Sequence, residues 1–226
     1  MSAPVFSIIL PLYKQLNHAE QLYNTYTTHL DTLPVSWELL FIVNGHNDGA
    51  ADKLKLLNNR SNVYVHYLEK GGWGRAVKYG LAQAKGTHLC YTNSARTEIK
   101  DLLLILNYAA VNNNNVVKAT RIIREKLIRK AGSILYNLMC RVLYKVPVWD
   151  INGTPKVLPR SVYEKMNIVS EDDLIDAEII VRCVKNSVMI IEIPVVSTAR
   201  ISGKSTTNFG SAFKMYSGIL KMKNWL

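Results

Sequence analysis

Residues Trp37–Ala50 read WELLFIVNGHNDGA, and this stretch decides the fold class. The apolar run Trp37–Val43 has the composition of a buried strand. It leads straight into the turn residues Asn44-Gly45 and Asn47–Gly49, and a helical pattern then covers Ala50–Leu57. A strand followed by a turn and a helix is the repeating unit of a parallel α/β sheet.

The same unit recurs on both sides of this stretch. Five strands alternate with helical patterns, which predicts an α/β fold with a mainly parallel central sheet, flanking helices and a Rossmann-like arrangement. The other expected strands are Val5–Leu10 (closed by Pro11), Val63–Leu68, His88–Thr92 and Val116–Thr120, and the helices are Ala19–Leu30, a helix after the glycine-rich turn Gly71–Gly74, and Leu102–Ala110.

After residue 120 the regular alternation of strand and helix patterns ends, but no linker or repeat separates this part from the first. We therefore expect a single domain over residues 1–226, with a first half at 1–120, a second half at 121–210 and a helical tail at 211–226. The elements expected after residue 120 are a basic helix Arg121–Tyr144, a turn-rich strand region Val148–Pro159, a helix Asp173–Lys185, a strand Val188–Val195 and the tail helix Ser211–Leu226.

The overall charge narrows the classes of partner. The chain carries 28 Lys+Arg against 17 Asp+Glu, a formal net charge of +11, which favours phosphorylated ligands, nucleic acid or an anionic membrane. Without a Cys/His finger or an RNA-recognition motif, nucleic acid is not expected. The scattered Cys90, Cys140 and Cys183 indicate reduced thiols. No signal peptide or spanning segment is recognised, so we expect a cytoplasmic protein, soluble or peripheral on the cytoplasmic membrane face.

Polar or glycine-rich segments follow the expected strands at their carboxyl ends, where ligands bind in open α/β sheets. One such segment would be an ordinary turn, but five in order favour a rim that binds phosphate or nucleotide. They are Pro11–Gln15, Asn44–Asp48, Gly71–Arg75, Asn93–Thr97 and Arg121.

Four of these regions resemble, in order, the motifs of family-2 glycosyltransferases. SIILPLYKQ (Ser7–Gln15) is similar to S-I-V-I-P-x-Y-N-E, and FIVNGHNDGA (Phe41–Ala50) to V-D-D-G-S-x-D-G-T. GGWGRAVKYGLAQAKG (Gly71–Gly86) resembles the family's glycine-rich helix entry, and HLCYTNSART (His88–Thr97) lies where the family has a strand ending in D-x-D. The resemblance implies a GT-A fold, a nucleotide-diphosphate sugar donor and inverting transfer.

The second half resembles the dolichyl- and polyprenyl-phosphate sugar synthase branch, so the similarity runs from about Ser7 to Thr206. The acceptor implied is a polyprenyl or dolichyl phosphate, or else a glycan precursor of the cell surface. The matching segments are VVKATR (Val116–Arg121), WDINGTPKVLPR (Trp149–Arg160), DAEIIVRC (Asp176–Cys183) and IIEIPVVSTARISGKST (Ile190–Thr206).

The resemblance also implies roles for individual residues. Residues 1–120 would bind the nucleotide sugar, with Gly72 and Arg75 approaching its diphosphate, although Tyr13 could instead be simple strand-end packing. In residues 121–210, Arg121, Arg129 and Ser133 would bind an acceptor phosphate. The alternative is that Arg121–Arg129 is only the solvated basic face of a helix. The further donor contacts implied are Pro11, Tyr13, Gln15, Val43, Asn44, Asn93 and Lys204, and the loop with Arg200 and Ser205 would close over the diphosphate and acceptor or remain a surface loop.

The chain departs from the family where the family holds its metal. Asn93 and Ala95 replace the two D-x-D acids, so no metal ligand is assigned; Mg²⁺ or Mn²⁺ stays open only through Asp48 or a later acid. Positive charge would neutralise the leaving diphosphate instead. The positions implied for the chemistry are Asn93, Ala95, Arg121 and Arg200, with Lys14, Arg75 and Arg96 as further cations.

Two functions therefore stay open. One is the sugar transferase; the other is a non-catalytic GT-A-like partner protein that binds nucleotide or lipid phosphate and has lost the D-x-D motif. Two local alternatives also remain. Glu178 either orients sugar hydroxyls or pairs with Arg182 one helical turn later. The stripe Phe213, Tyr216, Ile219 and Leu220 in the lysine-rich tail either lies on an anionic membrane or packs on its own domain.

Overall fold

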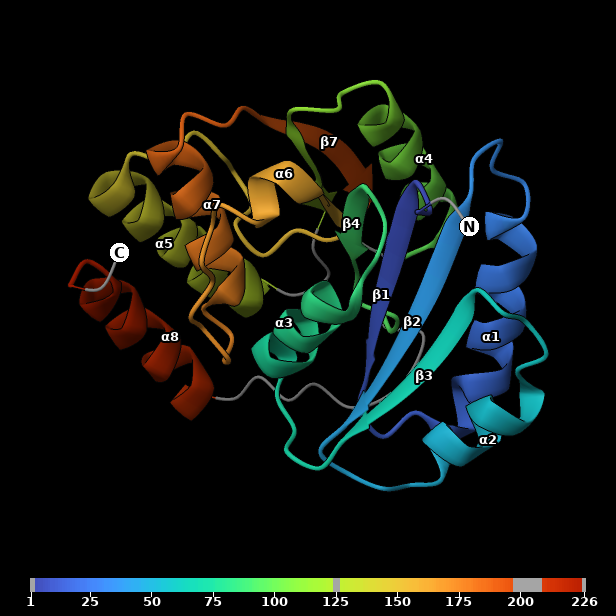
Figure 1. The fold of residues 1–226 in the computed structure, drawn as a ribbon. Coiled ribbons are helices and arrows are strands. Elements are labelled where there is room, and N and C mark those ends of the chain that lie inside the picture. The colour runs from blue at the N-terminus through green and yellow to red at the C-terminus, as the bar shows by residue number, and fades with distance from the viewer. Residues whose placement is uncertain (1–2, 124–126, 197–208, 225–226) are drawn as a thin grey trace.

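Seven strands form one sheet in the order β3-β2-β1-β4-β6-β5-β7 (Figure 1). The computed structural model describes residues 3–123, 127–196 and 209–224 of the 226, and within these it does not describe the side chains of 123, 127–131 and 209–213. The strands are β1 (Phe6–Leu12), β2 (Trp37–Asn44), β3 (Val63–Leu68), β4 (His88–Tyr91), β5 (Val116–Ile123), β6 (Lys156–Pro159) and β7 (Ile190–Val196).

The expected mainly parallel sheet is confirmed, with β6 as its one antiparallel strand among the described residues. β6 runs against both of its neighbours, β4 and β5. Its first residue, Lys156, therefore pairs with Tyr91, the last residue of β4. The start of β6 consequently lies at the same edge of the sheet as the carboxyl ends of the parallel strands.

Helices cover both faces of the sheet, because strand side chains alternate between two apolar clusters. Ile8 and Leu10 pack with α1, α2 and α4 on one face, whereas Ile9 packs with α3 and α7 on the other. A third cluster joins α5, α7 and α8 at the end of the molecule away from β3 (Figure 1). The helices are α1 (Leu16–Leu30), α2 (Ala50–Leu57), α3 (Trp73–Gln83), α4 (Ile99–Ala110), α5 (Leu127–Tyr144), α6 (Arg160–Tyr163), α7 (Ile175–Lys185) and α8 (Phe209–Met222).

The predicted end of the first strand, at Leu10, is wrong. β1 does not stop at Pro11 but continues to Leu12, with Pro11 opposite Ile42 of β2. The carbonyl of Ile9 accepts a hydrogen bond from the Thr92 N–H on the β4 side, at 3.2 Å. Pro11, two residues further on, faces the same side beyond the end of β4, so its missing N–H costs no ladder bond.

The predicted start of the first helix in the second half, at Arg121, is also wrong. Residues 121–123 extend β5, and Arg121 pairs with Val195 of β7, so the helix starts only at Leu127. The β-branched Thr120, Ile122 and Ile123 favour the strand here. The expected strand region at 148–159 shrinks to Lys156–Pro159, and the short helix α6 follows it without having been predicted.

Candidate functional site

An exposed aromatic ring and two glycine turns meet at the carboxyl ends of β1, β2 and β3. The side chain of Tyr13 is 38% exposed, and its ring lies beside Gly45, 3.4 Å from where a Cβ would be. A Cβ on Gly45, whose φ is +73°, would lie 2.4 Å from the Cα of Gly71. Only glycine allows this backbone contact, so the two turns pack directly against each other beside the exposed Tyr13 ring.

Asn44 ties these turns together from below. Its Nδ2 donates to the Leu12 carbonyl at 2.9 Å, and its Oδ1 accepts from the Gly72 N–H at 3.1 Å. The side chain is 3% exposed, and Val43 beside it is 2% exposed and belongs to the core. Pro11 is buried as well. The structure therefore places the predicted donor contacts Pro11, Val43 and Asn44 beneath the rim, where they shape it, and leaves Tyr13 on its surface.

The turn that replaces the family's acidic motif is fixed by its own hydrogen bonds. The Asn93 carbonyl accepts from the N–H groups of Arg96 and Thr97, each at 3.0 Å, and Asn93 Oδ1 accepts from the Ala95 N–H at 3.0 Å. Ser94 Oγ lies 3.1 Å from Gln15 Nε2, which ties the turn to the start of α1 and buries Gln15. The side chain of Ala95 is 1% exposed. The turn thus offers no carboxylate, and its one amide oxygen already accepts a hydrogen bond.

Asp48, the remaining candidate metal ligand, caps two helices. Its Oδ2 accepts from the Leu16 N–H and its Oδ1 from the Ala50 N–H, both at 3.1 Å. These are the first residues of α1 and α2, where backbone donors lack partners within the helix. In the part of the chain that the structure describes, no three His, Cys, Asp or Glu residues lie close enough to share a metal. The described residues therefore provide no set of three such ligands for Mg²⁺ or Mn²⁺, which bind several oxygen atoms.

The glycine turn before α3 packs against an acidic segment from the second half. A Cβ on Gly74, the second residue of α3, would lie 2.0 Å from the Asp172 carbonyl oxygen, so this position requires glycine. Arg75 donates to the Gly71 carbonyl at 2.9 Å and pairs with Glu171 at 3.3 Å. Hydrogen bonds from Arg75, and next from Lys78, lower the pKa of Glu171. The predicted diphosphate contact Arg75 is thus at the rim and held there by an acid.

The acids of residues 171–173 were missed in the sequence analysis. Asp172 caps Leu174 through a 3.0 Å hydrogen bond. Asp173 is half-buried, and its burial, followed by the charges of Asp172 and Asp176, raises its pKa. Three consecutive acids in a strongly basic chain, directly before a helix, were the available signal. They place proton-accepting groups at the ligand edge of the sheet.

On the other side of the edge, Arg121 is anchored by a second acid that the sequence analysis did not assign. Arg121 Nε and Nη2 donate to the two carboxylate oxygens of Asp150 at 2.7 and 2.8 Å. Asp150 is 2% exposed and the arginine side chain 25% exposed. Although burial acts to lower it, the Asp150 carboxylate holds the pKa of Arg121 above its ordinary value. This two-pronged pair fixes the guanidinium plane and leaves part of the side chain reachable.

The other predicted acceptor contacts are placed only in part. Arg129 and Ser133 lie one turn apart on α5, as expected, and Ser133 is partly exposed. The side chain of Arg129 and the residues Arg200, Lys204 and Ser205 lie outside the described part of the chain. Glu178 is fully buried, pairs with Arg182 at 2.7 Å and accepts from the N–H groups of Val169 and Ser170. Its predicted alternative as a partner of Arg182 is therefore the one observed.

Comparison with known proteins identifies the architecture. No protein-family model matches the chain. Glucosyl-3-phosphoglycerate synthase from Mycobacterium tuberculosis, solved with Mn²⁺, UDP and glucosyl-3-phosphoglycerate, superposes with a TM-score of 0.72 over 97% of this chain and 80% of its own, at 12% identity. The chain has the GT-A fold. The same enzyme with Mn²⁺, UDP-glucose and glycerol 3-phosphate gives the same TM-score and identity.

One curated relative of this GT-A chain is similar in sequence. An uncharacterized glycosyltransferase of Rickettsia typhi is 23% identical over 75% of the chain. The chain spans about half of that protein's length, 54%. The GT-A fold that the motifs implied is therefore confirmed, whereas the polyprenyl-phosphate branch finds no counterpart in these matches.

A buried polar row runs across the sheet between the glycine turns and the Arg121–Asp150 pair. Tyr91, Lys156, Lys118 and Glu192 are consecutive neighbours across β4, β6, β5 and β7. Both lysines are 0% exposed, and each has its own carboxylate: Lys156 pairs with Asp176 at 2.5 Å and Lys118 with Glu192 at 3.1 Å. Burial, and secondly the charge of Lys156, lower the pKa of Lys118 to about 8.

Asp176, at the start of α7, accepts hydrogen bonds from the Tyr91–Lys156 end of this row. It accepts from Lys156 and from the Tyr91 hydroxyl at 2.8 Å through Oδ1, and from Trp73 Nε1 at 2.9 Å through Oδ2. Trp73 is the first residue of α3, directly after the glycine turn. Glu192, at the other end of the row, accepts from the N–H of Trp149, the neighbour of Asp150. Hydrogen bonds thus link the row to the glycine turn at one end and to the neighbour of Asp150 at the other.

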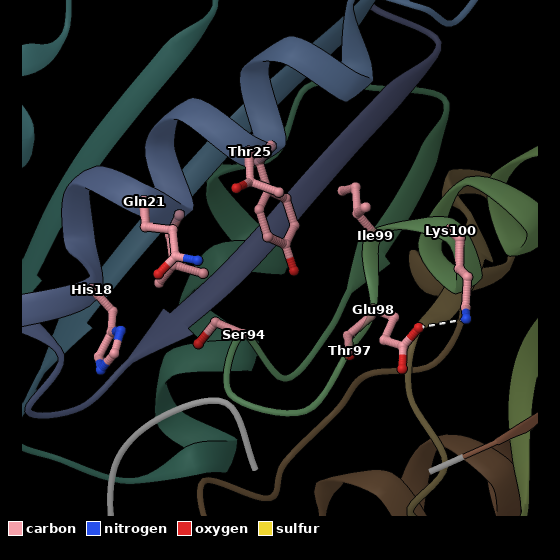
Figure 2. Close-up of a pocket in the computed structure, with 10 residues that line it drawn as sticks. His18, Gln21, Thr25, Ser94, Thr97, Glu98, Ile99 and Lys100 are labelled. Atoms are coloured by element: carbon pink, nitrogen blue, oxygen red, sulfur yellow. Dashed lines mark ion pairs between the residues drawn. The ribbon is translucent and has the colours of Figure 1, made fainter. Parts of the chain in front are cut away.

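A pocket of about 290 Å³ opens behind the Asn93-Ser94-Ala95 turn (Figure 2). His18, Gln21 and Thr25 of α1 line one wall, and Ser94 and the segment 97–100 line the other. Glu98 and Lys100 form an ion pair of 2.7 Å at its edge (Figure 2). Tyr26 also lines this pocket, and its buried hydroxyl has no hydrogen-bond partner among the residues described.

The contrast between Tyr26 and Tyr91 gives a first prediction. Tyr26→Phe removes a buried hydroxyl without a partner, so the free energy of unfolding should stay unchanged or rise by up to about 1 kcal/mol. Tyr91→Phe deletes the hydrogen bond to Asp176 and should lower it by about 1–3 kcal/mol. Urea unfolding of both variants checks this. A Tyr26→Phe protein less stable than Tyr91→Phe would contradict the assignment.

Proposed function

We propose that the chain is an inverting glycosyltransferase that moves a sugar from a UDP-sugar to a phosphate-bearing acceptor. The observation that carries the proposal is the layout of one sheet edge. Tyr13 and two backbone-packed glycine turns lie at the ends of β1, β2 and β3, and the anchored Arg121 lies at the end of β5. Among the possible donor nucleotides we choose UDP, because the structurally similar synthase binds UDP and UDP-glucose.

For the acceptor, we propose a polyprenyl or dolichyl phosphate, with a cell-surface glycan precursor as the other candidate. A phosphate is already ionised, so its oxygen can attack the anomeric carbon without a general base. The bond from that carbon to the diphosphate breaks, and UDP leaves with the electron pair. Arg121, held in one orientation by Asp150, would align the acceptor phosphate, with Ser133 one α5 turn beyond Arg129.

Positive charge from the protein would take over the usual task of a metal ion. Lys14 is exposed at the rim, and its Nζ lies 5.5 Å from the centre of the Tyr13 ring. Arg75 lies in the first turn of α3, which holds no acid. The free N–H groups at a helix start attract phosphate, so Arg75 and the start of α3 would stabilise the leaving diphosphate together.

The test is sugar transfer from UDP-sugars to polyprenyl phosphate, with and without EDTA and with added Mn²⁺. Because no three described His, Cys, Asp or Glu residues lie close enough to share a cation, we expect the same turnover in all three conditions. Turnover abolished by EDTA and restored by Mn²⁺ would contradict the metal-free arrangement. Binding of UDP, seen as a raised melting temperature, without turnover of any nucleotide sugar would refute the transferase itself.

Restoring one acid should bring back a metal response. Asn93→Asp keeps the oxygen that accepts from the Ala95 N–H, so the fold should tolerate it within about 0.5 kcal/mol. The new carboxylate would face the diphosphate, and we expect turnover of this variant to respond to Mn²⁺. Ala95→Asp is the poorer test, because it forces a charge into a position that is 1% exposed. An Asn93→Asp enzyme indifferent to Mn²⁺ would show that this turn does not meet the diphosphate.

The second candidate is a GT-A protein that binds nucleotide or lipid phosphate without catalysis. It is favoured by the same Asn93 and Ala95, which leave the edge without the family's acids. The UDP-binding and turnover measurements above separate the two candidates. For either, we propose a cytoplasmic location, supported by three free, buried cysteines that suit a reducing compartment. Among the residues described, no helix has the length and apolar character to cross a bilayer.

A further inference from the structure

Helix α5 turns an apolar stripe toward solvent. Its core side carries Tyr136, Asn137 and Cys140, all buried. Its opposite side exposes large apolar side chains at helical spacing, although such residues usually face a core. They are Ile134, 57% exposed, Leu135, 53%, Leu138, 53%, and Val142, 71%.

The tail helix α8, for which the sequence left membrane contact and packing on its own domain open, is packed on α5 and α7. Ile219 and Met222 are fully buried in the cluster that includes Tyr136 and Cys140. The hydroxyl of Tyr216 donates to the Gly132 carbonyl at 2.6 Å. Of Tyr216, Ile219 and Leu220, the described apolar residues of the α8 tail, only Leu220 is largely exposed. For the described part of α8, packing on its own domain is therefore the observed alternative, and the uncovered apolar face belongs to α5.

The charged side chains of α5 and of the C-terminal segment that includes α8 have one sign. Residues 127–145 contain Arg129, Lys130, Arg141 and Lys145 and no acid. Residues 193–226, which include α8, contain five Lys or Arg residues and again no acid. A second copy docking on this face would bring like charges together, which disfavours self-association. An anionic surface with an apolar interior complements both the charge and the stripe.

The stripe continues to the acceptor side of the candidate site. Trp149 is 70% exposed, and the guanidinium of Arg141 lies 4.0 Å from the centre of its ring. The next residue, Asp150, anchors Arg121. Exposed tryptophan next to a basic residue is typical of protein surfaces at the boundary between lipid headgroups and acyl chains.

We propose that α5 docks in the plane of an anionic membrane through the stripe Ile134, Leu135, Leu138 and Val142, with Trp149, Arg141 and Lys145 at the headgroup level. Docking requires only this surface. The further consequence, that it brings the Arg121 side of the sheet to an acceptor phosphate in the membrane, rests on the proposed function. The surface thereby selects a lipid-linked acceptor over a soluble one.

The experiment is co-sedimentation of the full chain with vesicles of phosphatidylcholine alone or with about one third phosphatidylglycerol, without donor or acceptor. We expect binding to the anionic vesicles that weakens with salt. The triple variant Ile134→Gln/Leu138→Gln/Val142→Gln should bind at least about tenfold more weakly, and Lys145→Glu about fivefold or more. A matched control is Leu56→Gln/Leu104→Gln/Val111→Gln, which changes three other exposed apolar residues, on α2, on α4 and just after α4, and should bind like the unaltered protein.

Three outcomes would overturn the proposal. They are no binding of the unaltered protein to anionic vesicles, equal binding by the α5 triple variant, or a concentration-dependent dimer in ultracentrifugation that the α5 triple variant abolishes. Transfer assays separate this failure from failure of the proposed function. If both hold, the α5 variant should keep its turnover with a short, water-soluble acceptor phosphate and lose it with a long-chain acceptor in vesicles. Vesicle binding without any turnover would leave docking intact and refute the transferase.

Discussion

Asp176→Asn is expected to lower the free energy of unfolding by about 3–5 kcal/mol, as loss of one partner of a buried ion pair does. Lys156 is 0% exposed, and Asp176 Oδ1 is its carboxylate partner at 2.5 Å. Asparagine preserves the shape of the side chain but leaves the buried ammonium without an opposite charge. It also weakens the acceptor for Trp73 and Tyr91. Equilibrium unfolding in urea at neutral pH measures the change.

Two controls make this result specific. In Lys156→Met/Asp176→Asn, both charges disappear and the amide oxygen can still accept from Trp73 or Tyr91, so much of the lost stability should return. Asp31→Asn removes the partner of Arg60 in an exposed pair, which should cost no more than about 1 kcal/mol. An Asp176→Asn protein within about 1 kcal/mol of the unaltered chain would mean that Lys156 is not buried as a charged group.

Arg121→Ala should reduce kcat/KM for the acceptor by about a hundredfold while the dissociation constant of UDP changes less than about threefold. Charge-assisted hydrogen bonds to a phosphate contribute about 1.5–3 kcal/mol each, and Arg121 is placed on the acceptor side only. The variant also removes the ion pair between Arg121 and the buried Asp150, so it will be less stable. Assays therefore belong well below its melting temperature.

The matched control is Arg160→Ala. Arg160 is also partly buried, but it donates to the carbonyls of Gly86 and Ala84 at the opposite edge of the sheet. Its loss should lower stability and leave the ratio of acceptor to donor effects unchanged. If Arg121→Ala weakened UDP and acceptor equally, Arg121 would not be an acceptor contact.

The periodic part of the fold was predictable because strand and helix patterns are local. The bounds of β3 and α2 agree with those expected from residues 63–68 and 50–57. The errors came where a neighbouring strand decides the outcome. Pro11 stays in β1 because β4 has already ended, and residues 121–123 stay in β5 because β7 pairs with them. Neither partner is visible in the local sequence.

The candidate site was predictable as a set of segments but not as a set of contacts. Arg75 and Arg121 were placed at the edge, yet their acids, Glu171 and Asp150, lie 96 and 29 residues away. Only the tertiary fold brings such pairs together. Amide side chains misled in another way. An asparagine side chain can contact a ligand, but Asn44 uses both its amide nitrogen and its amide oxygen to bond to the backbone of the turns around it. The amide oxygen of Asn93 likewise accepts from the backbone of its own turn.

The reversed direction of β6 has a consequence for how such a protein can diverge. At every parallel strand the ligand edge is met by the segment that leaves the strand, whereas at β6 it is met by residues 145–155, which enter it. That entering segment carries Trp149 and Asp150, and the Trp149 N–H donates to Glu192 at one end of the buried polar row. Exchange of residues 145–155 between related chains should therefore transplant acceptor preference and leave the choice of nucleotide unchanged.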